Sequence, residues 1–184
     1  IGTAAIAGNS YSWSPSTGLS ATNIAQPVAS PTATTTYTLT VTGANGCTQT
    51  DVVVVNVNTT IPTADAGPNK LLTCLVNSAQ IGTAAIAGNT YSWSPATGLS
   101  ATYIAQPIAS VTSTTVYTVT VTGTNGCTAT STVTVNVDTS FPTVDAGSDK
   151  LLNCTVTSAT IGTAAIPGNT YSWSPATGLS NTLI

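Results

Sequence analysis

The chain of 184 residues carries little charge: Lys70 and Lys150 are its only basic residues, five aspartates are its only acidic ones, and it contains no His or Met. Phosphate groups and anionic membrane surfaces are bound through clustered positive charge, so this composition excludes nucleic acid and membrane surfaces as natural partners. No apolar run approaches the ~18 residues that a membrane-spanning segment needs.

The sequence repeats itself with a period of 80 residues. The segment that begins at Ile1 recurs at Ile81 and, with one substitution, at Ile161. Residues 1–60 match their counterparts one period later at 45 of 60 positions, and the last 24 residues match at 21 of 24. A period of this length with strand-like segments inside it predicts a string of small domains.

Composition and alternation predict an all-β fold. Val, Thr, Tyr and Ile alternate along the chain, as in residues 117–122 (YTVTVT), which is the period-two pattern of a half-buried strand. In chain order, the complete repeat is predicted to contain an edge segment at 65–74, strands at about 78–86 and 90–94, a long connection at 95–110, and a hairpin of 114–122 with 127–137.

Domain boundaries are predicted where turn residues and charge concentrate, at 58–69 and 138–149, because both segments hold Pro, Gly and Asp and follow a valine-rich strand. Residues 1–61 are then the C-terminal part of one repeat, 62–141 one complete immunoglobulin-like sandwich, and 142–184 the N-terminal part of the next. Within the hairpin, Asn125 and Gly126 predict a tight turn.

Aromatic residues recur with the same period. Trp93 and its copies Trp13 and Trp173 lie between outward-facing serines, which predicts a tryptophan buried between two sheets; an exposed platform for stacking sugars is the alternative. Tyr37 and Tyr117 are predicted to be partly buried on the penultimate strand.

These motifs carry a resemblance. PTADAG at 62–67, YSWSP at 91–95, and the strand from Tyr117 that leads to Asn125-Gly126-Cys127 resemble the immunoglobulin-fold repeats of the polycystic-kidney-disease type (PKD-like). More narrowly, TYSWSPATGLSATYIAQPIAS and TTTYTLTVTGANGC resemble repeats of large, gliding-motility-associated surface adhesins of Bacteroidota. The resemblance implies type IX secretion, an outer-surface location, and a role in adhesion or in spacing a functional tip from the cell.

The four cysteines follow the same period, and an even, periodic set in an extracellular array predicts disulfides. Two pairings compete: Cys74 with Cys127 inside a domain, or Cys47 with Cys74 across a junction. The second would have to bridge a strand of roughly 33 Å at ~3.3 Å per residue, so the internal pair is favoured. Cys47 and Cys154 would then find partners outside this chain or in a neighbouring subunit.

Sites for metal ions and for catalysis have little support in the sequence. Asp138, Asp145 and Asp149 are candidate calcium ligands at the second junction, but the first junction has Asn58 and Asn69 at positions matching two of them, which favours turn-capping roles and no metal or other cofactor. Without His or Glu, the chain lacks the usual acid, base and activated nucleophile, so we expect no enzyme.

The chain holds two periods and 24 further residues, so neither incomplete repeat closes a sandwich alone. Two explanations stay open: an excerpt from a longer polymer, which we favour, or strand addition between successive chains. We therefore expect a stalk or filament of an extracellular bacterial adhesin, with copies of itself as end-to-end and lateral partners and an unknown surface or glycan target. The alternatives are a PKD-like accessory module of a secreted enzyme, and ice or polysaccharide binding by threonines such as Thr118 and Thr120.

Overall fold

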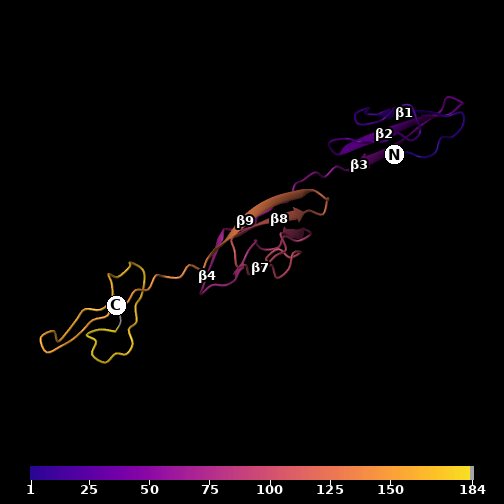
Figure 1. The fold of residues 1–184 in the computed structure, drawn as a ribbon. Coiled ribbons are helices and arrows are strands. Elements are labelled where there is room, and N and C mark those ends of the chain that lie inside the picture. Colours follow the sequence, from indigo (N-terminus) through magenta and orange to yellow (C-terminus); the bar gives the residue numbers. More distant parts are fainter. Residues whose placement is uncertain (183–184) are drawn as a thin grey trace. The chain divides into compact units, whose positions relative to one another are not determined.

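The computed structural model describes residues 1–182 of the chain, which divides into two compact units, Ile1–Val137 and Asp138–Ile184. Every regular element in the described residues is a β-strand, and none of these residues is helical (Figure 1). The predicted all-β fold is therefore confirmed. No helix that could cross a membrane occurs among residues 1–182.

The central repeat is a sandwich of a four-stranded and a two-stranded sheet. The larger sheet has the order β4-β9-β8-β6, in which the first and last strands of the repeat are neighbours. The smaller one pairs β5 with β7. The strand bounds are Lys70–Thr73 for β4, Ala79–Gln80 for β5, Thr90–Ser94 for β6, Ile108–Ala109 for β7, Thr115–Thr122 for β8 and Thr128–Asp138 for β9.

Alternation along β8 explains how the sandwich buries its core. Tyr117, Val119 and Val121 are each at most 1% exposed, whereas the threonines between them face the other side of the sheet and stay half-buried. The buried core lies between the two sheets and consists of Ala66, Leu72, Ile81, Trp93, Ala109, Tyr117, Val119, Val121, Val133 and Val135.

The predicted strands match the observed ones best where side chains alternate. The strand predicted at 90–94 is β6, and the predicted hairpin is β8 and β9. The strand predicted at 78–86 is only the two residues of β5, since Gly82 adopts a φ of +81° and a Cβ there would lie 2.1 Å from Ala105 O. The chain turns at this glycine to let two backbones approach, which ends the strand.

Residues 1–55 repeat part of this architecture in a three-stranded sheet of order β1-β2-β3. The strands are β1, Ser10–Ser14; β2, Thr35–Thr42; and β3, Thr48–Val55. Their pairing copies that of β6, β8 and β9: Trp13 is opposite Leu39, as Trp93 is opposite Val119.

The unit boundary at 137/138 lies four residues before the predicted boundary at 141/142. The predicted boundary at 61/62 falls in a strand-free segment, 56–69, within the first unit. Residues 139–182 hold no strand, but they keep bonds of the complete repeat: Gly162 N–H donates to Ala146 O at 2.9 Å, as Gly82 N–H does to Ala66 O at 2.9 Å.

Candidate functional sites

The contact between β4 and β9 joins the two ends of the complete repeat. Thr134 N–H donates to Asn69 Oδ1 at 2.9 Å, and Asn136 Nδ2 donates to Lys70 O at 3.4 Å. Ala66 N–H donates to the Ser131 hydroxyl at 3.2 Å. Residue numbers rise together along both partners, so the first and last strands run in the same direction.

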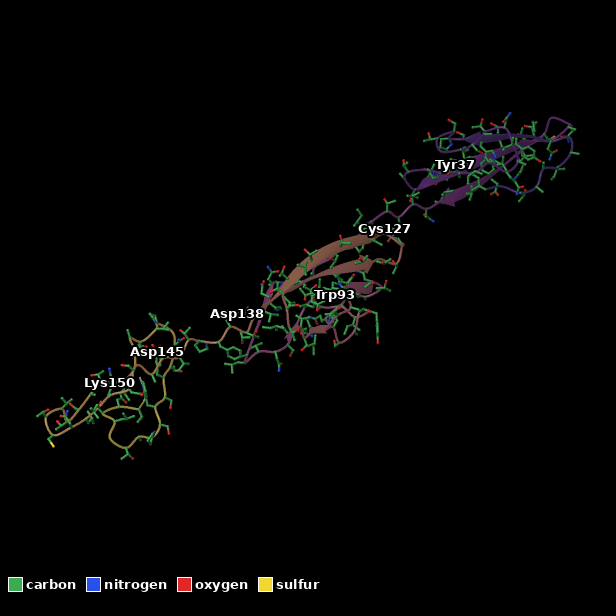
Figure 2. The ribbon with its side chains drawn as sticks, in the orientation of Figure 1. Tyr37, Trp93, Cys127, Asp138, Asp145 and Lys150 are labelled. Atoms are coloured by element: carbon green, nitrogen blue, oxygen red, sulfur yellow. The ribbon has the colours of Figure 1, made fainter. Side chains whose placement is uncertain are left out.

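Most of the repeated aromatic residues are buried. Figure 2 labels Trp93, which lies inside the sandwich of the complete repeat. Trp93 and Trp13 are 3% and 5% exposed, and each indole N–H donates to a backbone carbonyl, at Ile104 and Ile24 respectively. Since their faces are covered by the core, neither tryptophan offers a platform for stacking a sugar. In the second unit Trp173 is only half-buried.

The two buried tyrosines bind the long connection that precedes their strand. The hydroxyl of Tyr117 donates to Thr97 O at 2.6 Å, and that of Tyr37 donates to Thr17 O at 2.7 Å. Both side chains are fully buried, and burial raises the pKa of Tyr117 above its usual value.

All four cysteines are free thiols in the structure, and Cys47, Cys74 and Cys154 are exposed. The predicted Cys74–Cys127 bridge is not made, because the two residues lie at opposite ends of β9. Cys127 precedes the first residue of β9, whereas Cys74 follows β4, which runs beside the last residues of that strand. The 11 residues of β9 separate the two positions by roughly 35 Å, against the ~7 Å limit for a disulfide.

The sequence favours this bridge because it does not show in which direction β4 runs beside β9. Figure 2 shows Cys127 at the turn between β8 and β9, and Figure 1 shows β4 beside the other end of β9. The expectation that Cys47 and Cys154 have partners outside the chain stays a prediction.

Two of the three candidate aspartates at the second junction, Asp138 and Asp145, cap turns. Asp138 accepts hydrogen bonds from the hydroxyl and the amide of Ser140, and these bonds lower the pKa of Asp138. Asp145 Oδ1 accepts the amide of Gly147 at 2.8 Å, as Asp65 Oδ1 does for Gly67 at 2.8 Å. Within residues 1–182, no three His, Cys, Asp or Glu side chains form a group able to hold a metal ion.

The turn between β8 and β9 holds the segment that leads into the repeat. Asn125 Nδ2 donates to Asn58 O and Asn58 Oδ1, both at 3.2 Å, and to Thr60 O at 2.9 Å. Asn125 Oδ1 accepts the amide of Cys127 at 3.1 Å, so one side chain shapes the turn and binds residues 58–60. We call these bonds the junction contact.

The sequence indicated the turn but not the junction contact. Within this turn, residues 123–127, only Gly126 has a positive φ, and Gly126 N–H donates to Gly123 O at 2.9 Å. The loop is therefore a three-residue turn with a bulge rather than a two-residue Asn-Gly turn. This geometry leaves the Asn125 amide free to point at the preceding segment. The sequence signal that could have pointed to the junction contact is the recurrence of Asn-Gly one period apart.

Hydroxyl groups line the outer face of the larger sheet. The register places Thr118 between Ser94 on β6 and Thr132 on β9, and Thr120 between Ser92 and Thr130. This hydroxyl face is uncharged and regularly spaced, because period-two alternation sends the apolar residues to the core.

No protein-family model and no curated protein matches the chain. Among solved structures, it is similar to the PKD domain of the KIAA 1837 protein, with 26% identity, 45% of this chain and 92% of that one covered, and a TM-score of 0.37. It is also similar to domains 4 and 5 of the S-layer protein SbsC, with 15% identity, 71% and 70% covered, and a TM-score of 0.30. For the human desmocollin-1 ectodomain the identity is 12%, the TM-score 0.31, and the coverage 73% of this chain but 31% of that one.

Proposed function

We propose that the chain is a load-bearing structural repeat of an extracellular stalk or filament. The observation that carries this proposal is the adjacency of β4 and β9. When the two ends of the repeat are pulled apart, parallel first and last strands in one sheet are loaded along their length. Their hydrogen bonds must then break together, not one after another.

Two further features support a mechanical role. The junction contact ties residues 58–60 to the β8–β9 turn, which limits bending where the chain enters the repeat. The hydroxyl face and the low charge allow neighbouring chains to pack side by side. Copies of the chain, end to end and laterally, are the proposed partners, with a surface or glycan target at the far end.

The location on the outer surface of a bacterium, and the assignment to Bacteroidota adhesins linked to gliding motility, rest on the sequence resemblance. The proposed role includes no enzymatic activity and no cofactor, since it requires none. Sequencing the surrounding gene distinguishes the stalk from the main alternative, a PKD-like accessory module of a secreted enzyme. Many further copies favour a stalk, and a neighbouring catalytic domain favours an accessory module.

Force spectroscopy tests the mechanical proposal. The full chain is held at its two ends and stretched, and the force that unfolds the complete repeat is measured for the wild type and for Asn69→Ala. Since Asn69 Oδ1 accepts the amide of Thr134, its loss should lower that force. Asn77→Ala is the matched control, because exposed Asn77 contributes only its backbone carbonyl to a bond with Ser110. Equal forces for the three proteins would contradict the proposal.

The hydroxyl face supports a second candidate, binding of ice or a polysaccharide. Its regular spacing across three strands is the favouring observation. Binding of the full chain and of the Thr118→Val, Thr120→Val double variant to ice and to polysaccharides would be compared. Absence of binding by the wild type ends this candidate.

A further inference from the structure

Asn125 is followed by a glycine, and this pair of residues is chemically reactive. The backbone nitrogen of the residue after an asparagine can attack the side-chain carbonyl carbon, and a glycine hinders that attack least because it has no Cβ. The approach to Gly126 is open, since a Cβ built there would meet nothing within 4 Å. The pair occurs at two positions of the chain, 45–46 and 125–126, and both lie in hairpin turns.

Hydrogen bonds hold both reacting groups in the closed turn. Asn125 Nδ2 donates to the oxygens of Asn58 and Thr60 in the junction contact, and Asn125 Oδ1 accepts the amide of Cys127. The attacking nitrogen is engaged as well, because Gly126 N–H donates to Gly123 O at 2.9 Å. Ring closure needs both groups to move, so it requires local opening of the junction contact.

Deamidation would replace a donor with an acceptor at the centre of the junction contact. A bond forms between Gly126 N and Asn125 Cγ, the bond between Cγ and Nδ2 breaks, and ammonia leaves with the proton of Gly126 N–H. Water then opens the resulting succinimide ring and restores Gly126 N–H. The products are aspartate and isoaspartate, each with a carboxylate where the chain had a carboxamide.

The carboxylate has no donor to bind in residues 58–60. It faces the carbonyl oxygens of Asn58 and Thr60 and the side-chain oxygen of Asn58, which are all acceptors. The Asn58 amide is held in this orientation, because Thr60 N–H donates to Asn58 Oδ1 at 3.1 Å. Acceptors facing acceptors repel one another, so the junction contact would not re-form.

We propose that Asn125 is a self-modification site whose deamidation releases residues 58–60 from the β8–β9 turn permanently. The junction contact delays the reaction while it holds, and the product cannot restore the contact. The entry to the repeat therefore changes once, from a held segment to a free one, with water as the only co-reactant. The inference rests on the junction contact, which the proposed mechanical function uses to limit bending.

Asn58→Ala tests the link between the contact and the reaction. The change removes the oxygen that accepts from both Asn125 Nδ2 and Thr60 N–H, so the segment should leave the turn more often. Asn56→Ala is the matched control, since exposed Asn56 takes no part in the junction contact. The full chain and both variants are incubated in mildly alkaline, reducing buffer, and peptide mapping by mass spectrometry measures deamidation at residue 125.

We expect the wild type to deamidate at residue 125, Asn58→Ala to do so about fivefold faster or more, and Asn56→Ala to match the wild type. Asn45 is an internal reference, because it has the same turn bond to Cys47 N–H and its rate should be equal in the three proteins. A wild type that keeps Asn125 intact, or equal rates at residue 125 in Asn58→Ala and the wild type, would overturn the inference.

The released segment is measured separately. Anion-exchange chromatography isolates the deamidated chain by its added negative charge, and NMR relaxation compares its residues 58–60 with those of the intact chain. We expect larger motion after deamidation, and unchanged motion would also overturn the inference. The force experiment uses the bonds between β4 and β9, so the mechanical proposal fails or stands independently of these results.

Discussion

At the scale of single residues, the repeat depends on buried side chains whose polar ends reach backbone carbonyls. Trp93 and Tyr117 place their rings in the core, and both donate to the long connection between β6 and β8. The connection has little strand structure of its own, so these two bonds, together with the one from Trp93 N–H to Thr102 O at 2.8 Å, hold it against the sheet. Each donor is satisfied although its ring is buried.

Replacing Tyr117 with Phe should lower the free energy of unfolding by about 1 kcal/mol at neutral pH, because the bond to Thr97 O is lost. Burial raises the pKa of Tyr117 above 10.0 in the folded protein. The stability that this shift contributes is fully present below pH 10 and is lost as the pH rises through the folded pKa. Urea unfolding at several pH values should therefore show a smaller difference between the two proteins in strong base.

The matched control for this pH effect is Tyr103→Phe. Tyr103 is 76% exposed, so its replacement should leave the stability unchanged at neutral pH. A Tyr117→Phe variant as stable as the wild type at neutral pH would contradict the role assigned to its hydroxyl.

Gly82 and Gly126 have the same φ of +81° but different surroundings. A Cβ at Gly126 meets nothing within 4 Å, so Gly126→Ala should cost only the backbone strain, about 1 kcal/mol. Gly82→Ala adds a clash with Ala105 O and should cost at least about 2 kcal/mol more. Chemical denaturation of both variants measures the difference; equal losses would mean that the two backbones do not approach closely.

At the scale of elements, the β8–β9 hairpin connects the core of the repeat to the segment that precedes it. Its strands supply Val119, Val121, Val133 and Val135 to the core, and its turn supplies the junction contact. The same hairpin in the first repeat, β2 and β3, keeps the turn bond from Cys47 N–H to Asn45 Oδ1 at 3.1 Å. The turn geometry therefore depends on bonds within the hairpin itself, and the junction contact is a further interaction of the same Asn125 side chain.

Asn125→Asp separates the turn bond from the junction contact. It keeps the oxygen that accepts Cys127 N–H and removes the amide that donates to Asn58 and Thr60. We expect faster hydrogen exchange and larger motion at residues 58–60, measured by NMR relaxation, with the hairpin unchanged. Asn45→Asp is the matched control and should leave residues 58–60 as they are. Unchanged motion in Asn125→Asp would show that the junction contact does not order this segment.

At the scale of the whole molecule, the repeats differ in how far each is completed. Residues 62–138 hold both sheets and a closed core, whereas residues 1–55 lack the strand beside β3 and residues 139–182 hold no strand. Exposure follows this difference: Leu72 is buried, and Leu152, one period later, is exposed. The same local sequence thus has different surroundings according to which neighbours are present.

Thiol chemistry provides a prediction for the whole chain. With all four cysteines free, and Cys74 and Cys127 at opposite ends of β9, alkylation of the folded chain should label Cys47, Cys74 and Cys154 quickly. Half-buried Cys127 should react more slowly. Mass mapping without reduction should find no Cys74–Cys127 bridge in one chain. Finding that bridge would contradict the position of β4.

The all-β class, the repeat, the hairpin and β6 followed from the sequence alone, because alternation and turn residues act over a few neighbouring positions. The direction of β4, the shortness of β5 and the bonds of Asn125 did not, because each depends on residues about 25 to 70 positions away. Cys74 shows the consequence: its spacing suggested a bridge to Cys127, and only the packing of β4 along β9 separates them. Local pattern determines what a segment becomes, and long-range contacts decide beside which segment it lies.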